Sequence, residues 1–137
     1  FSTSSSVATI PVTSRCLIEK LSYKEDKVNF IIPIGATINM DGTALFECVV
    51  VIFIAQLYGI DLSFIEQLLI LLLALITSIG VAGIPSASFV AIIVILGAVG
   101  LPFEAVGIII GIDRLLDMLR TSVNVYGDTC CVSVVAK

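Results

Sequence analysis

The sequence predicts an all-α membrane protein built from broken helices and re-entrant helical hairpins. Of its 137 residues, 58% are apolar and only 13% are charged, and the mean hydropathy is +1.18. Soluble domains carry about 25% charged residues, so this composition indicates a membrane protein. Seven of the 18 charged residues (7 Lys or Arg, 11 Asp or Glu) lie between Arg15 and Lys27. The apolar segments differ in length and are interrupted by Gly, Pro and Asn, which favours broken and re-entrant helices.

The first predicted helix follows a cluster of hydroxyl side chains and contains the apolar run VATIPV. Ser and Thr ahead of an apolar run are typical of a helix N-terminus, and such termini attract anionic groups in a membrane. The alternative, a flexible serine linker, would lack the apolar continuation. The cluster comprises Ser2, Thr3, Ser4, Ser5, Ser6 and Thr9. After this helix, we expect the charged stretch from Arg15 to Lys27 to form a polar loop.

The second segment, from Phe30 to Tyr58, exceeds the roughly 20 residues that cross a bilayer. It is interrupted by Pro33 and by the stretch 39–42. One helix face carries small or polar residues at every fourth position, namely Gly35, Asn39, Thr43 and Glu47. Asp41 lies about 160° from that face in a regular helix. If the helix unwinds at 39–41, freed carbonyls and the Asp41 carboxylate suit a hard cation such as Na⁺. The alternative is a plain kink.

Glu47 has no evident cationic partner in the sequence. Burial disfavours the charged form of a carboxyl group, so Glu47 could exchange a proton near neutral pH. The alternative is a permanently protonated residue that only packs in the interior.

The third segment reads as a helical hairpin. Leu62 to Ile79 and Ser86 to Val99 flank the Gly-rich and Pro-containing stretch SIGVAGIPS. The uninterrupted apolar runs, 68–76 and 89–99, are short. Apolar runs of about 10–14 residues favour re-entrant over spanning helices.

The last segment, Leu101 to Ala136, is long enough to span a membrane and carries a polar stripe. Its members are spaced 4, 3, 4 and 4 residues apart and stay within about 80° of a helix. They are Asp113, Asp117, Arg120, Asn124 and Asp128, with Thr121 at the edge. Charges at membrane depth face a protein interior or a water cavity. The alternative is a helix on a soluble domain whose stripe faces water.

Arg120 is the informative member of this stripe. Its guanidinium fits a carboxylate through two hydrogen bonds, so it could bind a substrate carboxylate. It could also pair with Asp117, three residues earlier. Both can hold if Asp117 meets a substrate ammonium when Arg120 meets a carboxylate. Together they suit a zwitterion with an acidic side chain.

A weak internal repeat supports a transport site. SSSVATIP (4–11) matches SIGVAGIP (78–85) at five positions, and NMDGT (39–43) and NVYGD (124–128) follow in the same order. Paired helix interruptions in corresponding halves are typical of transporter binding sites.

Other features exclude several functional classes. The net charge of −4 and the lack of a Lys/Arg cluster argue against a nucleic-acid partner. Histidine is absent, and the cysteines lack metal-ligand spacing, so we expect packing residues or incidental thiols. No signal peptide is visible, and we expect both ends to be cuts in a longer protein.

Four stretches of the chain resemble the glutamate transporter family: TSSSVATIP, PIGATINMDGTALFE, SIGVAGIP and DMLRTSVNVYGD. These are sodium-coupled symporters of acidic amino acids and dicarboxylates, including animal excitatory amino acid transporters and archaeal aspartate transporters. The resemblance covers essentially all 137 residues. It implies a transporter and not an enzyme, with sodium as the coupling ion and no cofactor. It also implies a homotrimeric, multi-pass protein of the plasma membrane.

The resemblance also implies a layout. The chain would be the C-terminal part of an elevator-type transport domain, without the scaffold domain and helix 3. Its parts would be the tip and second arm of hairpin 1 (1–20), a loop (21–29), the broken helix 7 (30–59), hairpin 2 (62–99) and helix 8 (101–136).

The resemblance assigns site residues by position. Substrate would meet Ser5, Ser6, Thr43, Asp117, Arg120, Thr121 and Asn124, with a gate from Ile84 to Ser88. One sodium would lie among Gly35, Asn39, Asn124 and Asp128. A second would lie among Thr37, Met40, Ser78, Ile79 and Val81. A third would use Asn39 and Asp41, completed by helix 3.

The chain departs from the family pattern in its charges. A second Arg usually lies at the first tip or directly after the substrate-binding Asp, but here these positions are Ser4 and Met118. Arg114 is a candidate to compensate. Ser86 and Ser88 replace smaller gate residues. Glu47 matches the proton-carrying Glu of the animal transporters, which implies proton coupling and potassium counter-transport.

We therefore expect a sodium-coupled symporter of glutamate or aspartate. The alternatives are a sodium-coupled dicarboxylate carrier, a neutral amino acid carrier, or a fragment without activity of its own. Arg120 argues against a neutral substrate, because its buried charge would stay unpaired.

Overall fold

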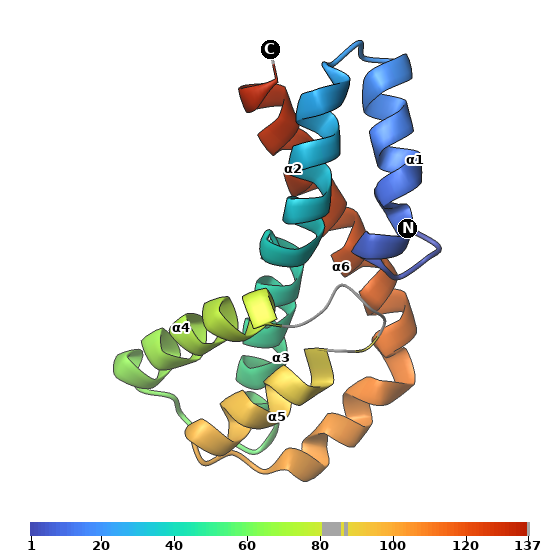
Figure 1. The fold of residues 1–137 in the computed structure, drawn as a ribbon. Helices are drawn as coiled ribbons and strands as arrows, with labels where there is room; N and C mark the ends of the chain where they lie inside the picture. The colour runs from blue at the N-terminus through green and yellow to red at the C-terminus, as the bar shows by residue number, and fades with distance from the viewer. Residues whose placement is uncertain (81–85, 87, 137) are drawn as a thin grey trace.

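The computed structural model describes residues 1–80, 86 and 88–136, and this part of the chain is helical without strands. The all-α prediction is therefore confirmed. Figure 1 shows the helices in chain order. They are α1 (Ser6–Glu19), α2 (Glu25–Ile38), α3 (Asp41–Leu57), α4 (Phe64–Gly80), α5 (Ser88–Ala98), the short 3₁₀ helix η1 (Phe103–Ala105) and α6 (Val106–Val135).

The first two helices pack side by side as a hairpin. Ser5 caps α1, because its hydroxyl accepts a hydrogen bond from the Ala8 N–H at 3.2 Å. The expected loop from Arg15 to Lys27 is wrong over most of its length, since α1 continues to Glu19 and α2 begins at Glu25. The physical reason lies in the first turn of α2, where the carboxylates of Glu25 and Asp26 interact favourably with the helix dipole.

The helix break expected near Asn39 is confirmed, and it is two residues long. α2 ends at Ile38 and α3 begins at Asp41. The Met40 N–H bonds to the Ile38 carbonyl at 3.2 Å, so the regular pattern of bonds to the fourth preceding residue stops here. Together, α2 and α3 form a 33-residue run that is long and apolar enough to cross a membrane.

The next two helices, α4 and α5, lie against each other and against α3. They contain 17 and 11 residues, or about 26 and 17 Å of helix. Both are shorter than the roughly 30 Å of bilayer hydrocarbon. Ser63 and Glu66 form a capping box at the start of α4, with the Glu66 carboxylate 2.8 Å from the Ser63 N–H. The expected hairpin tip at 81–85 and residue 87 lie outside the described residues.

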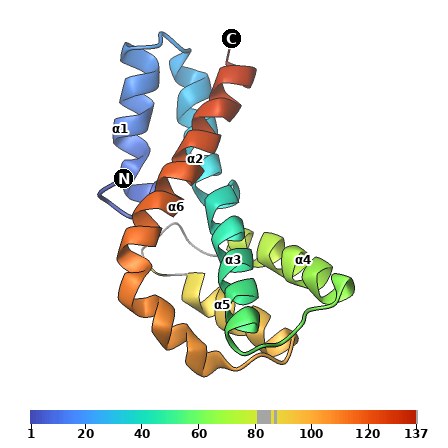
Figure 2. The ribbon, with the colours of Figure 1, turned by 180° about the vertical axis from the view of Figure 1, so that it is seen from behind.

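The long helix α6 runs from the part of the molecule with α3 and α5 to the part with α1 and α2 (Figure 2). It contributes to a hydrophobic cluster near each of its ends. Val106 and Ile109 near its start belong to the cluster with α3, α4 and α5. Val132 near its end belongs to the cluster with α1 and α2. The polar stripe, from Asp113 to Asp128, lies on the part of α6 between the two clusters. The fold therefore has a polar layer between two apolar ones.

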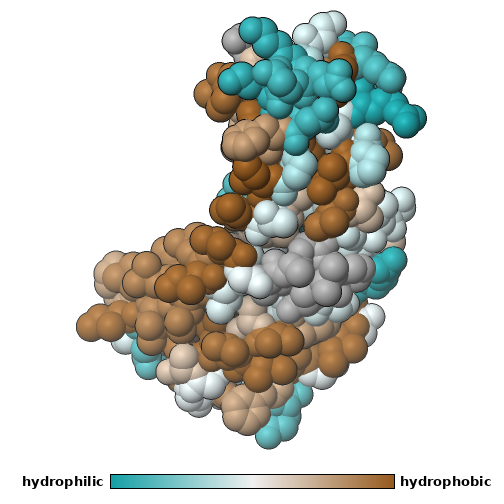
Figure 3. All heavy atoms as spheres, in the orientation of Figure 1, coloured by the Kyte–Doolittle hydropathy of each residue, from teal (hydrophilic) through white to brown (hydrophobic). Residues whose placement is uncertain are grey.

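The surface at the α1–α2 connection is polar. Figure 3 shows hydrophilic residues gathered where α1 connects to α2, and hydrophobic residues over α4 and α5. Large apolar side chains are widely exposed, including Ile65 at 78% and Val90 at 69%. Such an apolar surface requires a lipid or protein partner.

Candidate substrate and cation site

The polar stripe of α6 faces the interior of the protein. All five members are buried, with exposed fractions of 4% for Asp113, 4% for Asp117, 6% for Arg120, 3% for Asn124 and 2% for Asp128. Thr121 is also buried. The alternative of a stripe facing water is therefore wrong.

Arg120 lies at the centre of this stripe with its charge matched. Its Nε and Nη2 donate to Asp117 Oδ1 at 3.1 and 2.5 Å, and Nη2 also reaches Asp113 Oδ1 at 3.4 Å. Nη1 donates to the Ser88 hydroxyl at 2.6 Å. The guanidinium stacks on Phe46, 4.2 Å from the ring centroid, as a cation–π contact. The expected pairing with Asp117 is thus present, and two carboxylates share one cation.

Ser86 and Ser88 join the stripe from the α4–α5 hairpin. The Ser86 N–H donates to Asp117 Oδ2 at 3.2 Å, and its hydroxyl donates to Asp113 Oδ2 at 2.8 Å. Ser86 has a φ of 60°, a conformation that a non-glycine residue rarely adopts. Hydrogen bonds to two charged carboxylates offset the strain, so this part of the hairpin is held to α6.

The first turn of α3 docks on α6 through Asn124. The Gly42 N–H donates to Asn124 Oδ1 at 2.8 Å. Asn124 Nδ2 in turn donates to the Thr43 hydroxyl at 3.1 Å and to the Met40 sulfur at 3.3 Å. A Cβ at Gly42 would lie 2.6 Å from the Arg120 carbonyl, so glycine permits this close approach. The side chain of Asn124 therefore links the α2–α3 break to the part of α6 that carries Arg120.

Oxygen-bearing side chains converge at the break beside Asp128. Asn39 Nδ2 lies 3.0 Å from Asp128 Oδ1. A Cβ at Gly127 would lie 2.8 Å from Asn39 Nδ2 and 3.1 Å from Asp41 Oδ2, and a Cβ at Gly35 would collide with the Asp128 carboxylate. These glycines leave room for hard oxygen donors, which suit Na⁺. Among the described residues, no three or more His, Cys, Asp or Glu are placed to hold a metal ion together, so a cation here would need amide and backbone oxygens.

The second expected sodium set is only partly assembled in the described part of the chain. Met40 and Ser78 are buried, and the Ser78 hydroxyl bonds to the Leu75 carbonyl at 3.1 Å. Thr37 is exposed, and its hydroxyl bonds to the Ile34 carbonyl of its own helix at 2.8 Å. Ile79 is 55% exposed. Val81, and Ile84 of the expected gate, lie outside the described residues.

Glu47 is fully buried beside the α4 helix. Its Oε2 accepts a hydrogen bond from the Thr77 hydroxyl at 2.7 Å. Its Oε1 has no hydrogen-bond partner within residues 1–80, 86 and 88–136. Glu47 thus lies in the interior, as its helix face predicts.

The start of α1 lies beside α6 in both ribbon views (Figures 1 and 2). Ser5 and Ser6 are buried there. Ser4 has a φ of 49°, and its buried hydroxyl has no partner among the residues described. Arg114 is exposed, and the two ion pairs found in this part of the chain both belong to Arg120. The expectation that Arg114 compensates for a missing cation is therefore not supported by its position.

Four residues near the site make contacts that the sequence does not predict. Asp113 has a signal, since it precedes Asp117 by one turn on the stripe. Ser86 falls within the expected gate from Ile84 to Ser88, but nothing in the sequence predicts its hydrogen bonds to Asp113 and Asp117. Phe46 and Thr77 have no such signal, because an apolar ring and a single hydroxyl fit any buried helix. Their roles depend on which helices meet in space.

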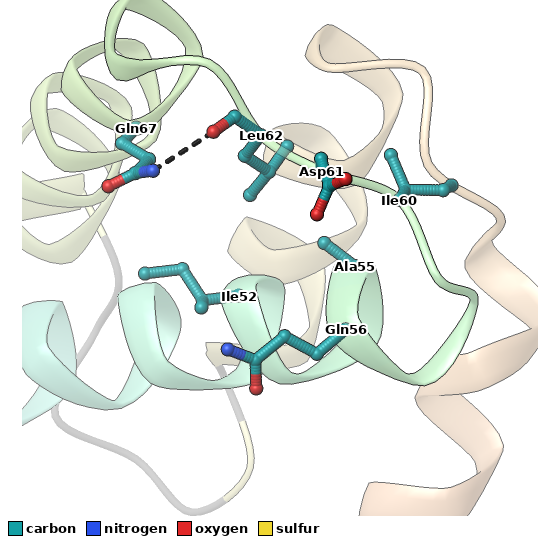
Figure 4. A pocket seen from close by; sticks show the side chains of 7 residues that line it. All are labelled: Ile52, Ala55, Gln56, Ile60, Asp61, Leu62 and Gln67. Carbon is teal, nitrogen blue, oxygen red and sulfur yellow. Dashed lines mark hydrogen bonds between the residues drawn. The ribbon is translucent and has the colours of Figure 1, made fainter.

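A separate hollow of about 270 Å³ lies between the end of α3 and the start of α4 (Figure 4). Gln56, Asp61 and Gln67 are its polar lining residues, and Gln67 Nε2 bonds to the Leu62 carbonyl at 3.0 Å. None of the expected site residues lines it. The buried polar stripe of α6 is therefore the candidate site, and this hollow is not part of it.

Comparisons with known proteins find relatives along nearly the whole chain. The model of the sodium:dicarboxylate symporter family matches residues 1–137. An excitatory amino acid transporter of Caenorhabditis elegans is 49% identical over 133 residues, covering 97% of this chain and 26% of the relative. Excitatory amino acid transporter 3 of Mus musculus is 52% identical over 134 residues (98% and 26%). Excitatory amino acid transporter 2 of Homo sapiens is 49% identical over 133 residues (97% and 23%). The chain spans about a quarter of the length of these relatives.

Proposed function

Because this chain belongs to the sodium:dicarboxylate symporter family, we propose that the whole protein is a sodium-coupled symporter of glutamate or aspartate. The relatives named above are excitatory amino acid transporters. The observation that carries the proposal is the buried Arg120, held between Asp117 and Asp113 on α6. A charged pair at this depth is costly without a functional partner.

Substrate binding proceeds by an exchange of partners. The substrate side-chain carboxylate takes the Arg120 guanidinium, and the substrate ammonium takes the Asp117 carboxylate. Each buried charge then keeps an opposite charge, so neither is left unpaired. The remaining contacts, to the main-chain carboxylate and the surroundings, fall to Thr121, Asn124, Thr43, Ser5, Ser6, Ser88 and Ile84.

Sodium binds where oxygen donors meet the helix break. Asn39, Asp128 and the carbonyls near Gly35 supply hard oxygen ligands. Asn124 links this region to the substrate, because it contacts both Met40 and Thr43. A cation that orders the break therefore also orders a residue one turn from Arg120. This shared side chain gives sodium and substrate a physical basis for coupling.

Glu47 carries the coupled proton. Its buried carboxyl group and the one unpartnered oxygen suit a group that gains and loses a proton. Potassium counter-transport, an elevator movement, trimeric assembly and a multi-pass location in the plasma membrane complete the proposal, on the basis of the family. As part of a transporter, the chain is not expected to be an enzyme.

A neutral amino acid carrier is the second candidate, because the pairing of Arg120 removes the objection that its charge would stay unpaired. Arg120 already has carboxylate partners within its own helix, so a neutral substrate would not leave its charge unpaired. A dicarboxylate without an ammonium would instead leave Asp117 without a new partner. Uptake of labelled aspartate, alanine and succinate distinguishes an acidic amino acid carrier, a neutral amino acid carrier and a dicarboxylate carrier.

The test is uptake by the full-length protein in liposomes. Labelled aspartate should accumulate with an inward sodium gradient and not with choline. Asp128→Asn should weaken the sodium dependence, whereas Glu104→Gln, at an exposed position, should behave like the native protein. Absence of uptake for every substrate under a sodium gradient would contradict the proposal.

A further inference from the structure

Thr77 places one hydroxyl group among three acceptors. Its Oγ1 lies 2.7 Å from Glu47 Oε2, 2.7 Å from the Leu73 carbonyl oxygen and 3.3 Å from the Ala74 carbonyl oxygen. A hydroxyl carries one hydrogen but accepts through two lone pairs. It therefore cannot donate to Glu47 and to Leu73 at the same time.

The two protonation states of Glu47 resolve this competition differently. When Glu47 is ionised, Thr77 donates its hydrogen to the carboxylate. When Glu47 takes up a proton from water, the new Oε2–H donates to Thr77 Oγ1, and the Thr77 hydrogen turns to the Leu73 carbonyl. The Thr77 hydroxyl therefore keeps a hydrogen bond to Glu47 in both states, as donor in one and as acceptor in the other, and the proton returns to water on release.

Few other groups act on Glu47. From α6, the charge of Arg120 attracts the Glu47 carboxylate and is itself balanced by Asp113 and Asp117. On α3, Cys48 follows directly in the chain. The sequence of α5 contains no titratable residue, and Glu66, the single one in α4, lies at the opposite end of that helix. Among the described residues, Thr77 donates the one hydrogen bond found at Glu47.

We propose that Thr77 is a positioning residue that sets the proton affinity of Glu47 by exchanging donor and acceptor roles with it. This inference rests on the proposed function, in which Glu47 carries a proton. It adds a hydrogen bond from the hairpin arm α4 to a step that otherwise involves Glu47 on α3 and the charge of Arg120 on α6.

Thr77→Val tests this by removing the hydroxyl and keeping the branched shape. A hydrogen bond to a charged acceptor is stronger than one to a neutral group. Losing it should favour protonated Glu47, so the midpoint of the pH dependence of uptake should rise by about one unit. Thr77→Ser keeps the hydroxyl and should retain the native midpoint. In a Glu47→Gln background, Thr77→Val should have no effect on the pH profile.

Infrared titration of the full-length protein tests the role of Thr77 separately from the proton-carrying role of Glu47. The acid carbonyl band lost in Glu47→Gln reports protonation of Glu47 without any transport. A midpoint of this band that moves up in Thr77→Val supports the role of Thr77, even if uptake is abolished. An unchanged midpoint overturns it. If Glu47→Gln leaves the pH dependence of uptake intact, the proton-carrying role of Glu47 fails instead, and the infrared midpoint still decides on Thr77.

Discussion

A single guanidinium organises the interior of this chain. Arg120 contacts two carboxylates, one hydroxyl and one aromatic ring, and it is 6% exposed. These partners lie on three different helices. Asp113 and Asp117 come from its own helix, Ser88 from α5 and Phe46 from α3. Because the Arg120 charge is already paired in this structure, the substrate binding proposed above would exchange ionic partners and would not bury a new charge.

Arg120→Ala should abolish recognition of acidic substrates. Loss of one partner of a buried charge pair costs about 2–5 kcal/mol, so the KM for aspartate should rise at least about thirtyfold. Uptake kinetics of the full-length protein measure this. Arg114→Ala is the matched control, because Arg114 lies on the same helix but is exposed. An unchanged KM in Arg120→Ala would show that the acidic group binds elsewhere.

At the scale of residues, the sequence predicted which side chains are buried better than what they contact. The spacing of the α6 stripe placed Asp117 and Arg120 together in the interior, because helical periodicity alone fixes that face. The contact between Thr77 and Glu47 spans 30 positions of the chain. It depends on how α3 meets α4, which no local pattern encodes.

At the scale of helices, the close approach of α3 to α6 depends on a missing side chain. A Cβ at Gly42 would lie 2.6 Å from the Arg120 carbonyl and 2.9 Å from the Val123 Cβ. The carbonyl oxygen belongs to the α6 backbone and the Cβ is attached directly to it, so neither atom can move away without shifting the helix. This contact carries the hydrogen bond from Gly42 to Asn124.

Gly42→Ala should therefore destabilise the protein by about 1–3 kcal/mol, as overpacked sites do. Thermal unfolding in detergent, followed by circular dichroism, measures this. Gly111→Ala is the control, because a Cβ there meets nothing within 4 Å and alanine favours a helix. If both variants unfold at the same temperature, the two helices are not as close as described.

Among the described residues, the helices depart most from the prediction in the charged stretch. Pro33, Gly35 and Asn39 predict a broken helix, and the break lies at 39–40. The prediction of a loop from Arg15 to Lys27 is wrong over most of its length, because a run of charged residues does not by itself end a helix. Charged residues also suit the exposed ends of helices, and only residues 20–24 connect α1 to α2.

At the scale of the whole molecule, the surface divides into a polar end and an apolar body. The α1–α2 connection is charged, whereas α4 and α5 expose apolar side chains such as Leu72 and Val94. A surface of this kind is stable only with its apolar part out of water. The polar end should therefore meet the aqueous phase, and α4 should lie in lipid or against another part of the protein.

Thiol labelling of the full-length protein tests this division. In a variant without native cysteines, Lys24→Cys should react rapidly with a membrane-impermeant maleimide. Leu72→Cys should react slowly, because the reactive thiolate does not form in an apolar environment. Both variants should label fully after denaturation, which controls for the presence of the thiol. Equal rates in the membrane would mean that water reaches α4, and the apolar body would then need another explanation. Slow labelling at Leu72 alone, with uptake retained, would place the buried stripe of α6 behind a dry surface, where a charge such as Arg120 meets its partners without competition from water.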